Sequence, residues 1–176
     1  LTMFSKNDEI KYEGKHFKIN THPIFKNIDE AQNYPILCVC HGRINVKKQF
    51  IRAAKHQGLI SISDYPDEFR FAIDQMTEYG NSFNTVEKQY QSVFYMTINI
   101  NKDHAKAEQE ADSFIKQYYG VNIWGDRWGP YGESQKIIDR VNKYIEAGAT
   151  TIIFRFASFN QIEQLQRFCN QIQKNI

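Results

Sequence analysis

Cysteine is scarce in this chain, and its few copies do not have the spacing of a disulfide framework. The 176 residues include three cysteines, an odd number, at Cys38, Cys40 and Cys169. Free thiols are typical of a reducing compartment. The sequence therefore predicts a cytoplasmic protein that depends on a packed core and not on disulfides.

Long apolar runs and an excess of one charge are also missing. No apolar stretch approaches the roughly 18 residues of a membrane-spanning helix, and no secretory signal pattern is found at the first residues. The 22 basic and 20 acidic side chains leave a formal net charge of only +2. This balance gives no support for a nucleic-acid partner or an anionic membrane surface. The sequence predicts neither partner.

What the chain does have is hydrophobic content, 41% of its residues, which is enough for one domain with a sizeable core. Segments that combine apolar and β-branched residues predict four strands, at residues 35–40, 59–63, 92–100 and 150–156. Helical periodicity predicts helices over residues 46–56, 69–79, 103–119, 134–147 and 160–173. Alternation of strands and helices indicates an α/β fold with a parallel sheet.

The clearest of these steps lies near the carboxyl end. A glycine-rich turn at residues 128–132 opens a helix with apolar residues at helical spacing, and Gly148 follows its last turn. The continuous apolar strand that comes next leads out to Arg155. Turn, helix, buried strand and polar residue form the repeating unit of a TIM-type (β/α)8 barrel.

The same region resembles a known family. Residues 128–132 (Trp-Gly-Pro-Tyr-Gly), 144–149 (Tyr-Ile-Glu-Ala-Gly-Ala) and 153–158 (Ile-Phe-Arg-Phe-Ala-Ser) resemble the carboxyl-terminal end of bacterial luciferase-like flavin or deazaflavin oxidoreductases. Further similarities lie upstream in the same order, at residues 53–56, 101–103 and 118–120. The resemblance covers nearly the whole chain.

The resemblance implies a fold larger than this chain can build. An eight-stranded barrel typically needs about 250 residues, so residues 35–176 are expected to be the C-terminal half of a luciferase-like barrel. Residues 1–34 are polar and are expected to form an extended or irregular lead-in, with a turn between two extended pieces around residues 12–17. The family's N-terminal half, which usually holds the catalytic histidine, has no counterpart here.

An open half-barrel exposes two sheet edges and the face that would line the barrel. We therefore expect a homodimer or an association with a missing N-terminal half. The sequence suggests that this inner face is lined by strand residues Leu37, Val39, Ile62, Phe94, Met96 and Ile153.

The resemblance also implies a cofactor, either flavin mononucleotide (FMN) or the deazaflavin F420, and a small organic substrate. In the family a glycine pair after the corresponding strand helps to hold the cofactor phosphate, and this chain has His41 and Gly42 there, followed by Arg43. Amides at a glycine turn can bind an anion, and an arginine adds charge. These three are candidate cofactor-binding residues. The alternative is a plain turn with a solvated arginine.

Arg155 is the fourth candidate, because barrel enzymes build their sites at the carboxyl ends of strands. It would contact the cofactor or another anion; a salt bridge to a neighbouring acid is an equally open alternative. No catalytic residue is predicted, because the five histidines are scattered. Two functions remain: part of a flavin- or deazaflavin-dependent oxidoreductase or monooxygenase, or a non-catalytic structural or flavin-carrying half-barrel subunit.

Two other groups of residues suggest further chemistry. Cys38, Cys40 and His41 could bind a metal, but both cysteines fall on one face of a buried strand without a second ligand pair, so core packing is favoured and no metal site is predicted. Trp124 and Trp128 could form a lid over a flat cofactor. Anchoring of their loop on the outside of the barrel is favoured.

Overall fold

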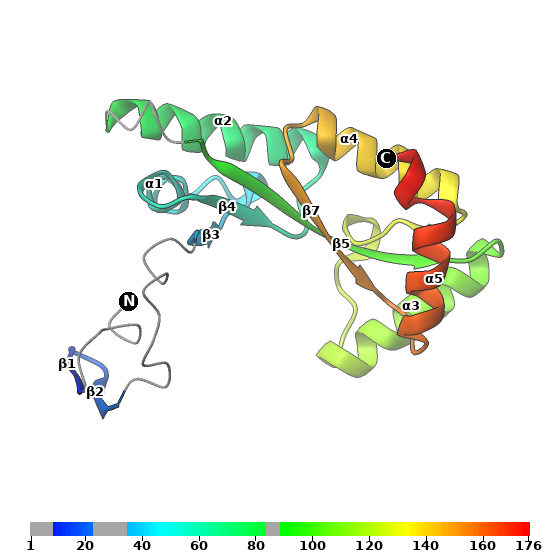
Figure 1. Ribbon diagram of the computed structural model, residues 1–176, viewed down its shortest axis with the longest axis horizontal. Coiled ribbons are helices and arrows are strands. Elements are labelled where there is room, and N and C mark those ends of the chain that lie inside the picture. The colour runs from blue at the N-terminus through cyan, green and yellow to red at the C-terminus, as the bar shows by residue number, and fades with distance from the viewer. Residues whose placement is uncertain (1–8, 23–34, 84–88) are drawn as a thin grey trace. The chain divides into compact units, whose positions relative to one another are not determined.

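The computed structural model (Figure 1) describes residues 9–22, 35–83 and 89–176. The chain divides into two units, Leu1–Pro35 and Ile36–Ile176. In the first unit, β1 (Ile10–Glu13) and β2 (Lys18–Thr21) pair antiparallel. The turn predicted between two extended pieces is thus found as a hairpin. The rest of the predicted lead-in, residues 1–8 and 23–34, lies outside the described residues.

The second unit is built on a parallel sheet. Its four main strands are β3 (Leu37–Val39), β4 (Gly58–Ser61), β5 (Gln91–Ile100) and β7 (Thr151–Phe156). They pair in chain order, β3 with β4, β4 with β5 and β5 with β7, and every pairing is parallel. These four strands confirm the sequence prediction. A two-residue strand, β6 (Tyr131–Gly132), pairs with the carboxyl end of β5 and was not predicted.

Helices alternate with these strands, close to their predicted bounds. They are α1 (Lys47–Lys55), α2 (Pro66–Ser82), α3 (His104–Tyr119), α4 (Ser134–Glu146) and α5 (Gln161–Gln171). Short 3-10 turns precede α1 (η3, Gly42–Ile44), precede β6 (η4, Gly125–Arg127) and follow α5 (η5, Gln173–Asn175). Gly148 adopts a positive φ of 98° after α4, as its position in the sequence predicts.

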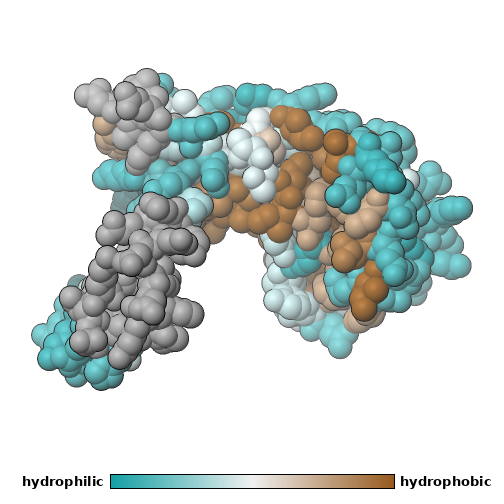
Figure 2. Space-filling view, in the orientation of Figure 1, coloured by the Kyte–Doolittle hydropathy of each residue, from teal (hydrophilic) through white to brown (hydrophobic). Residues whose placement is uncertain are grey.

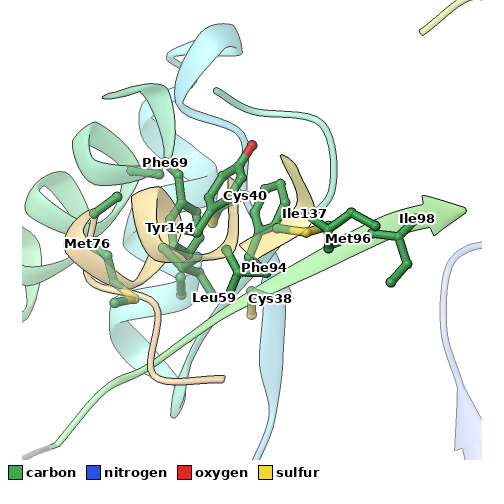
Figure 3. Close-up of a cluster of buried hydrophobic side chains, with 14 of the residues drawn as sticks. Cys38, Cys40, Leu59, Phe69, Met76, Phe94, Met96, Ile98, Ile137 and Tyr144 are labelled. Carbon is green, nitrogen blue, oxygen red and sulfur yellow. The ribbon is translucent and has the colours of Figure 1, made fainter. Parts of the chain in front are cut away.

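The main core lies between one face of the sheet and helices α1, α2, α4 and α5. Figure 3 shows Phe94 of β5 beside Phe69 of α2 and Tyr144 of α4. The rings of Phe94 and Tyr144 stack with centroids 3.7 Å apart, and Phe69 meets Phe94 edge-on at 5.3 Å. Cys38 and Cys40 are buried in the same core, which confirms the packing interpretation of the two cysteines.

This packing overturns part of the predicted inner face. Phe94 and Met96, 2% and 1% exposed, point to the helices and not to the barrel interior. The prediction failed because β5 is covered on both faces over most of its length, so its sequence does not alternate and gives no signal of orientation. Val39 and Ile153, by contrast, are 56% and 40% exposed, as expected of an uncovered inner face.

The strand register shows which residues lie on that inner face. Val39 lies beside Ile60, Ile60 beside Val93, and Tyr95 beside Ile153 in the neighbouring strand. Figure 2 shows apolar surface over β4 and β7, beneath α2 in this view. Four adjacent parallel strands with α1, α2, α4 and α5 on one face form a partial TIM-type barrel, as the sequence predicts.

The connection from β5 to β7 contains two helices, and only α4 joins the main core. Helix α3 and the loop before β6 form a second cluster at the carboxyl end of the sheet, with α3 on the opposite side of β5 from α2 and α4 (Figure 1). Trp128 is 4% exposed there and Trp124 stacks on it at 3.8 Å. Anchoring of this loop is confirmed, although its place is the carboxyl end of the strands. Among the described residues, no helix has the length and apolar character to span a membrane.

Candidate functional site

A buried carboxylate, Asp64, organises the carboxyl ends of β3 and β4. Its Oδ2 atom accepts hydrogen bonds from the Gly42 amide at 2.7 Å and from the Ser61 hydroxyl at 2.9 Å. Its Oδ1 atom lies 3.6 Å from both His41 Nδ1 and Arg43 Nε. That oxygen has no hydrogen-bond partner among the described residues. Two strand ends that are distant in the sequence are thus tied together by one side chain.

Asp64 has no solvent exposure, yet it keeps its charge. Burial by itself would raise the pKa of its carboxyl group, but the nearby His41 ring and the hydrogen bonds from Gly42 and Ser61 outweigh this effect and lower the pKa below its ordinary value. Asp64 is therefore ionised at neutral pH. It provides a fixed counter-charge for the nearby Arg43 guanidinium.

The structure brings His41, Gly42 and Arg43 together, but most of their polar groups serve the turn itself. The Gly42 amide is taken by Asp64, and a Cβ at Gly42 would lie 1.8 Å from the Glu68 carbonyl oxygen in α2. Glycine is required here by this close backbone approach. The His41 backbone is held from both sides by the Gln49 side chain, at 3.0 and 2.8 Å.

Arg43 is the member of this group that remains accessible. Its Nη2 atom donates to the Ser63 hydroxyl at 3.0 Å, and its side chain is 35% exposed. The guanidinium is only partly compensated by Asp64, because their 3.6 Å contact is longer than a hydrogen bond. An anion at the carboxyl end of β3 would therefore meet Arg43 before the other two residues.

The loop at residues 121–130, here called the tryptophan loop, is fastened to the first turn of α2 by an ion pair. Arg127 donates two hydrogen bonds to the Glu68 carboxylate, at 2.6 and 3.0 Å, and its guanidinium lies 4.3 Å above the Tyr65 ring. The hydrogen bonds from Arg127 lower the pKa of Glu68. Bidentate geometry of this kind is both stronger and more specific than a single contact. It holds the loop at the carboxyl end of the sheet.

Arg155 occupies a different part of the same edge, on the inner face of β7. Its guanidinium donates to the Tyr119 hydroxyl at 2.6 Å and to Thr97 Oγ1 at 2.9 Å. It lies 4.6 Å from the centroid of the Trp128 ring and 5.5 Å from that of Tyr95. Neither hydroxyl carries charge, and no carboxylate forms an ion pair with Arg155 within the part of the chain that the structure describes. The salt-bridge alternative is not found there.

The four predicted residues therefore fall into two groups. Because the strand order is β3-β4-β5-β7, three strand spacings separate the turn at residues 41–43 from Arg155. Neighbouring strands lie 4.7–4.9 Å apart, so this corresponds to roughly 14 Å. Between the two groups, the inner face presents Val93, Tyr95 and Thr97.

Asp64, its partner Ser61 and the Arg43 partner Ser63 were not predicted as site residues. A usable signal was present, because residues 61–64 (Ser-Ile-Ser-Asp) are mostly polar and follow a buried strand, where barrel sites are built. The pairing of Arg127 with Glu68 carried no comparable signal. The two residues are 59 positions apart, and only the packing of the loop brings them together.

Comparison with known proteins supports the fold and only the fold. No protein-family model and no curated protein matches the sequence. Among solved structures, an F420-dependent secondary alcohol dehydrogenase in complex with an F420-acetone adduct has a TM-score of 0.69 at 12% identity, over 97% of this chain and 57% of that one. The coenzyme F420-dependent tetrahydromethanopterin reductase from Methanopyrus kandleri has a TM-score of 0.62 at 14% identity, over 93% and 57%.

A third similar structure is flavoprotein 390, with a TM-score of 0.52 at 13% identity over 74% of this chain and 62% of that one. All three are luciferase-like proteins, so the resemblance predicted from the sequence is confirmed in the fold. The chain spans a little over half the length of the first two structures, 57% in each case.

Proposed function

We propose that this chain forms the C-terminal half of the barrel in a flavin- or deazaflavin-dependent oxidoreductase or monooxygenase, and contributes part of its cofactor site. Arg155 is the observation that carries the proposal. It is a half-buried cation without a carboxylate partner among the described residues, and its Nε atom has no acceptor there either. It stands on the inner face at the carboxyl end of a barrel strand. Such a group is complementary to an anion or to the carbonyl edge of a polar ring.

Each of the four candidate residues has its own part in this proposal. Arg155 contacts the polar edge of the cofactor ring, and Tyr95 and Trp128 supply flat apolar surface beside it. Arg43, in the turn at residues 41–43, binds the phosphate of the cofactor. His41 and Gly42 shape the turn that presents Arg43. A cofactor with a ring at one end and an anionic tail at the other can contact both Arg155 and the turn at residues 41–43.

When bound, the cofactor supplies the redox chemistry, as a hydride carrier or, for reduced flavin, by reaction with oxygen. The chain's own residues bind and orient it and keep water away. The names of two similar structures mention F420, and the third is a flavoprotein. These names support a flavin or a deazaflavin cofactor, and binding measurements with FMN and with F420 distinguish the two.

The half-barrel also needs a cover over its inner face. Val39 and Ile153 are exposed on the two edge strands, and the chain spans only part of the similar barrels. We infer that a second copy of the chain, or the missing N-terminal half of the barrel, closes this face and completes the site. The same partner would supply the catalytic group that the described residues of this chain do not offer.

Titration of the purified chain with FMN, and separately with F420, tests the proposal. We expect saturable binding of one of them by absorbance and fluorescence, with the mass in solution measured in the same buffer. Arg155→Gln should weaken binding about tenfold or more, which corresponds to about 1.4 kcal/mol. Arg70→Gln is the matched control, because Arg70 is an exposed arginine on the helical side of the sheet, where its Nη2 donates to the Glu146 carbonyl.

Absence of binding at every oligomeric state would contradict the proposal for this chain. Equal affinity of Arg155→Gln and the parent chain would remove Arg155 from the site. Tight binding without turnover of any small alcohol, aldehyde or reduced-flavin substrate would instead favour the flavin-carrying, non-catalytic alternative.

A further inference from the structure

A pocket with a volume of 540 Å³ lies between α3 and α4, with the tryptophan loop and β6 as its remaining wall. Volumes of about 300–1,000 Å³ are typical of small-molecule sites. Arg155 and residues 41–43 do not line it. The pocket therefore shares the Trp128 ring with the candidate cofactor site but none of its four candidate residues.

The α4 wall carries three cations. Lys136, Arg140 and Lys143 follow one another at intervals of four and three residues, which places them on one face of the helix. None of the three pairs with a carboxylate within residues 9–22, 35–83 and 89–176. Arg140 donates to the Tyr144 hydroxyl, at 3.3 Å, and its guanidinium also lies over the Tyr65 and Tyr144 rings. Burial raises the pKa of that hydroxyl to about 12, so it stays neutral and leaves the Arg140 charge uncompensated.

The acids on the α3 wall, in contrast, already have polar partners. Asp112 pairs with Lys116 at 2.7 Å and accepts a hydrogen bond from Asn122, and these contacts lower its pKa. Glu108 contacts His104 at 3.1 Å. Two further carboxylates, Asp126 and Asp139, also line the pocket. Asp139 lies on α4 itself, so the α4 wall has three cations and one acid among its pocket-lining residues and carries net positive charge.

Residues around the pocket also have unused hydrogen-bonding groups. Arg140 Nε, Trp128 Nε1, the Tyr131 hydroxyl and Asn122 Oδ1 are buried and lack partners among the described residues. Three of these four groups are donors. Burial also raises the pKa of Tyr131, which keeps its hydroxyl protonated. Because a buried donor without an acceptor is costly, a ligand that brings acceptor oxygens is favoured.

We propose that this pocket binds a small molecule through an oxyanion, a phosphate or a carboxylate group. The oxyanion lies against Lys136, Arg140 and Lys143 of α4, and the body of the molecule packs towards Trp128. The Trp128 ring also contacts the Arg155 guanidinium. A ligand in the pocket therefore changes the surroundings of an aromatic ring that both sites share.

The test follows the indole N–H signals by NMR, which is simple because the chain has only two tryptophans. The full chain is titrated with inorganic phosphate and with succinate, each at an ionic strength matched with sodium chloride. We expect a saturable shift of the Trp128 signal with at least one of them. The double variant Lys136→Gln and Lys143→Gln should weaken that binding about tenfold or more.

Lys48→Gln is the matched control, because Lys48 is an exposed lysine of α1 and does not line the pocket. It should leave the affinity unchanged, and near-ultraviolet circular dichroism checks that each variant is folded. Saturation with phosphate alone assigns the pocket to phosphate compounds, and saturation with succinate assigns it to carboxylates. Shifts no larger than those caused by sodium chloride, or an affinity that the double variant leaves unchanged, would overturn the proposal.

Discussion

At the scale of single residues, Asp64 connects four groups from two strand ends. The Gly42 amide and the Ser61 hydroxyl donate to it, and the His41 ring and the Arg43 guanidinium lie 3.6 Å away. A carboxylate in this setting is stable only while its partners remain, because an unpaired buried charge costs far more than the hydrogen bonds return. Asp64 is thus a structural requirement for the turn that presents Arg43.

Asp64→Asn should destabilise the chain by roughly 1–3 kcal/mol at neutral pH, since one buried acceptor is lost and the Arg43 charge loses its counter-charge. Urea unfolding at several pH values measures this effect. Asp74→Asn, at an exposed position of α2, is the control and should change little.

The pH dependence of the effect has a definite sign. The folded-state pKa of Asp64 is lowered, so its contribution to stability is present above the unfolded-state pKa of about 3.9 and is lost as the pH falls through the folded-state value. The difference between the parent chain and Asp64→Asn should therefore be largest near neutral pH and shrink below about pH 4. A difference that stays constant across this range would show that the carboxylate charge does not stabilise the fold.

At the scale of elements, β7 shows how one strand serves two purposes. Ile152, Phe154 and Phe156 pack against the helical side, where the Phe154 ring meets Phe168 of α5 at 4.6 Å. Ile153 and Arg155 alternate with them and point to the inner face. Because side chains alternate across a strand, a slip of one residue would bury Arg155 in the core.

Phe154→Ala should cost about 3 kcal/mol, because it leaves a cavity in the main core. Ile153→Ala should cost less than about 1 kcal/mol, since Ile153 is already 40% exposed in the single chain. Thermal or urea unfolding at low protein concentration, where association is weakest, compares the two. Equal losses would contradict the assignment of faces.

At the scale of the whole chain, the uncovered inner face and the two free sheet edges are the main unsatisfied surfaces of the fold. Within the described residues, the outer edges of β3 and β7 have no strand partner. Exposed edges and apolar sheet faces promote association. In a pair of such half-barrels related by a two-fold axis, β7 of each copy would lie beside β3 of the other.

We therefore expect the purified chain to self-associate, with a mass that depends on concentration in sedimentation experiments. Ile153→Lys should shift the equilibrium towards the monomer, because it places a charge on the face that associates. Lys136→Gln, on α4 away from this face, is the control. A well-folded monomer at micromolar concentration would show that the inner face needs no partner.

Sequence patterns predicted the local elements of this chain well. Helix and strand periodicity depend on neighbours only a few residues apart, so residues 134–147 and 150–156 were recognised as a helix and a strand without any tertiary information. The burial of Cys38 and Cys40 followed from the same reasoning. The order of strands and helices, with the resemblance near Trp128, was enough to predict half of a barrel.

The site depends on contacts that periodicity does not encode. Asp64 binds an amide 22 positions away, and Arg155 meets Thr97 and Tyr119, which are 58 and 36 positions away. The orientation of Phe94 and Met96 was wrong in the prediction because a strand covered on both faces carries no alternation. The sequence by itself determined which elements form and in what order. Long-range packing decided which face each strand residue takes, that the Gly42 amide binds Asp64, and that Arg155 is left without a described counter-charge.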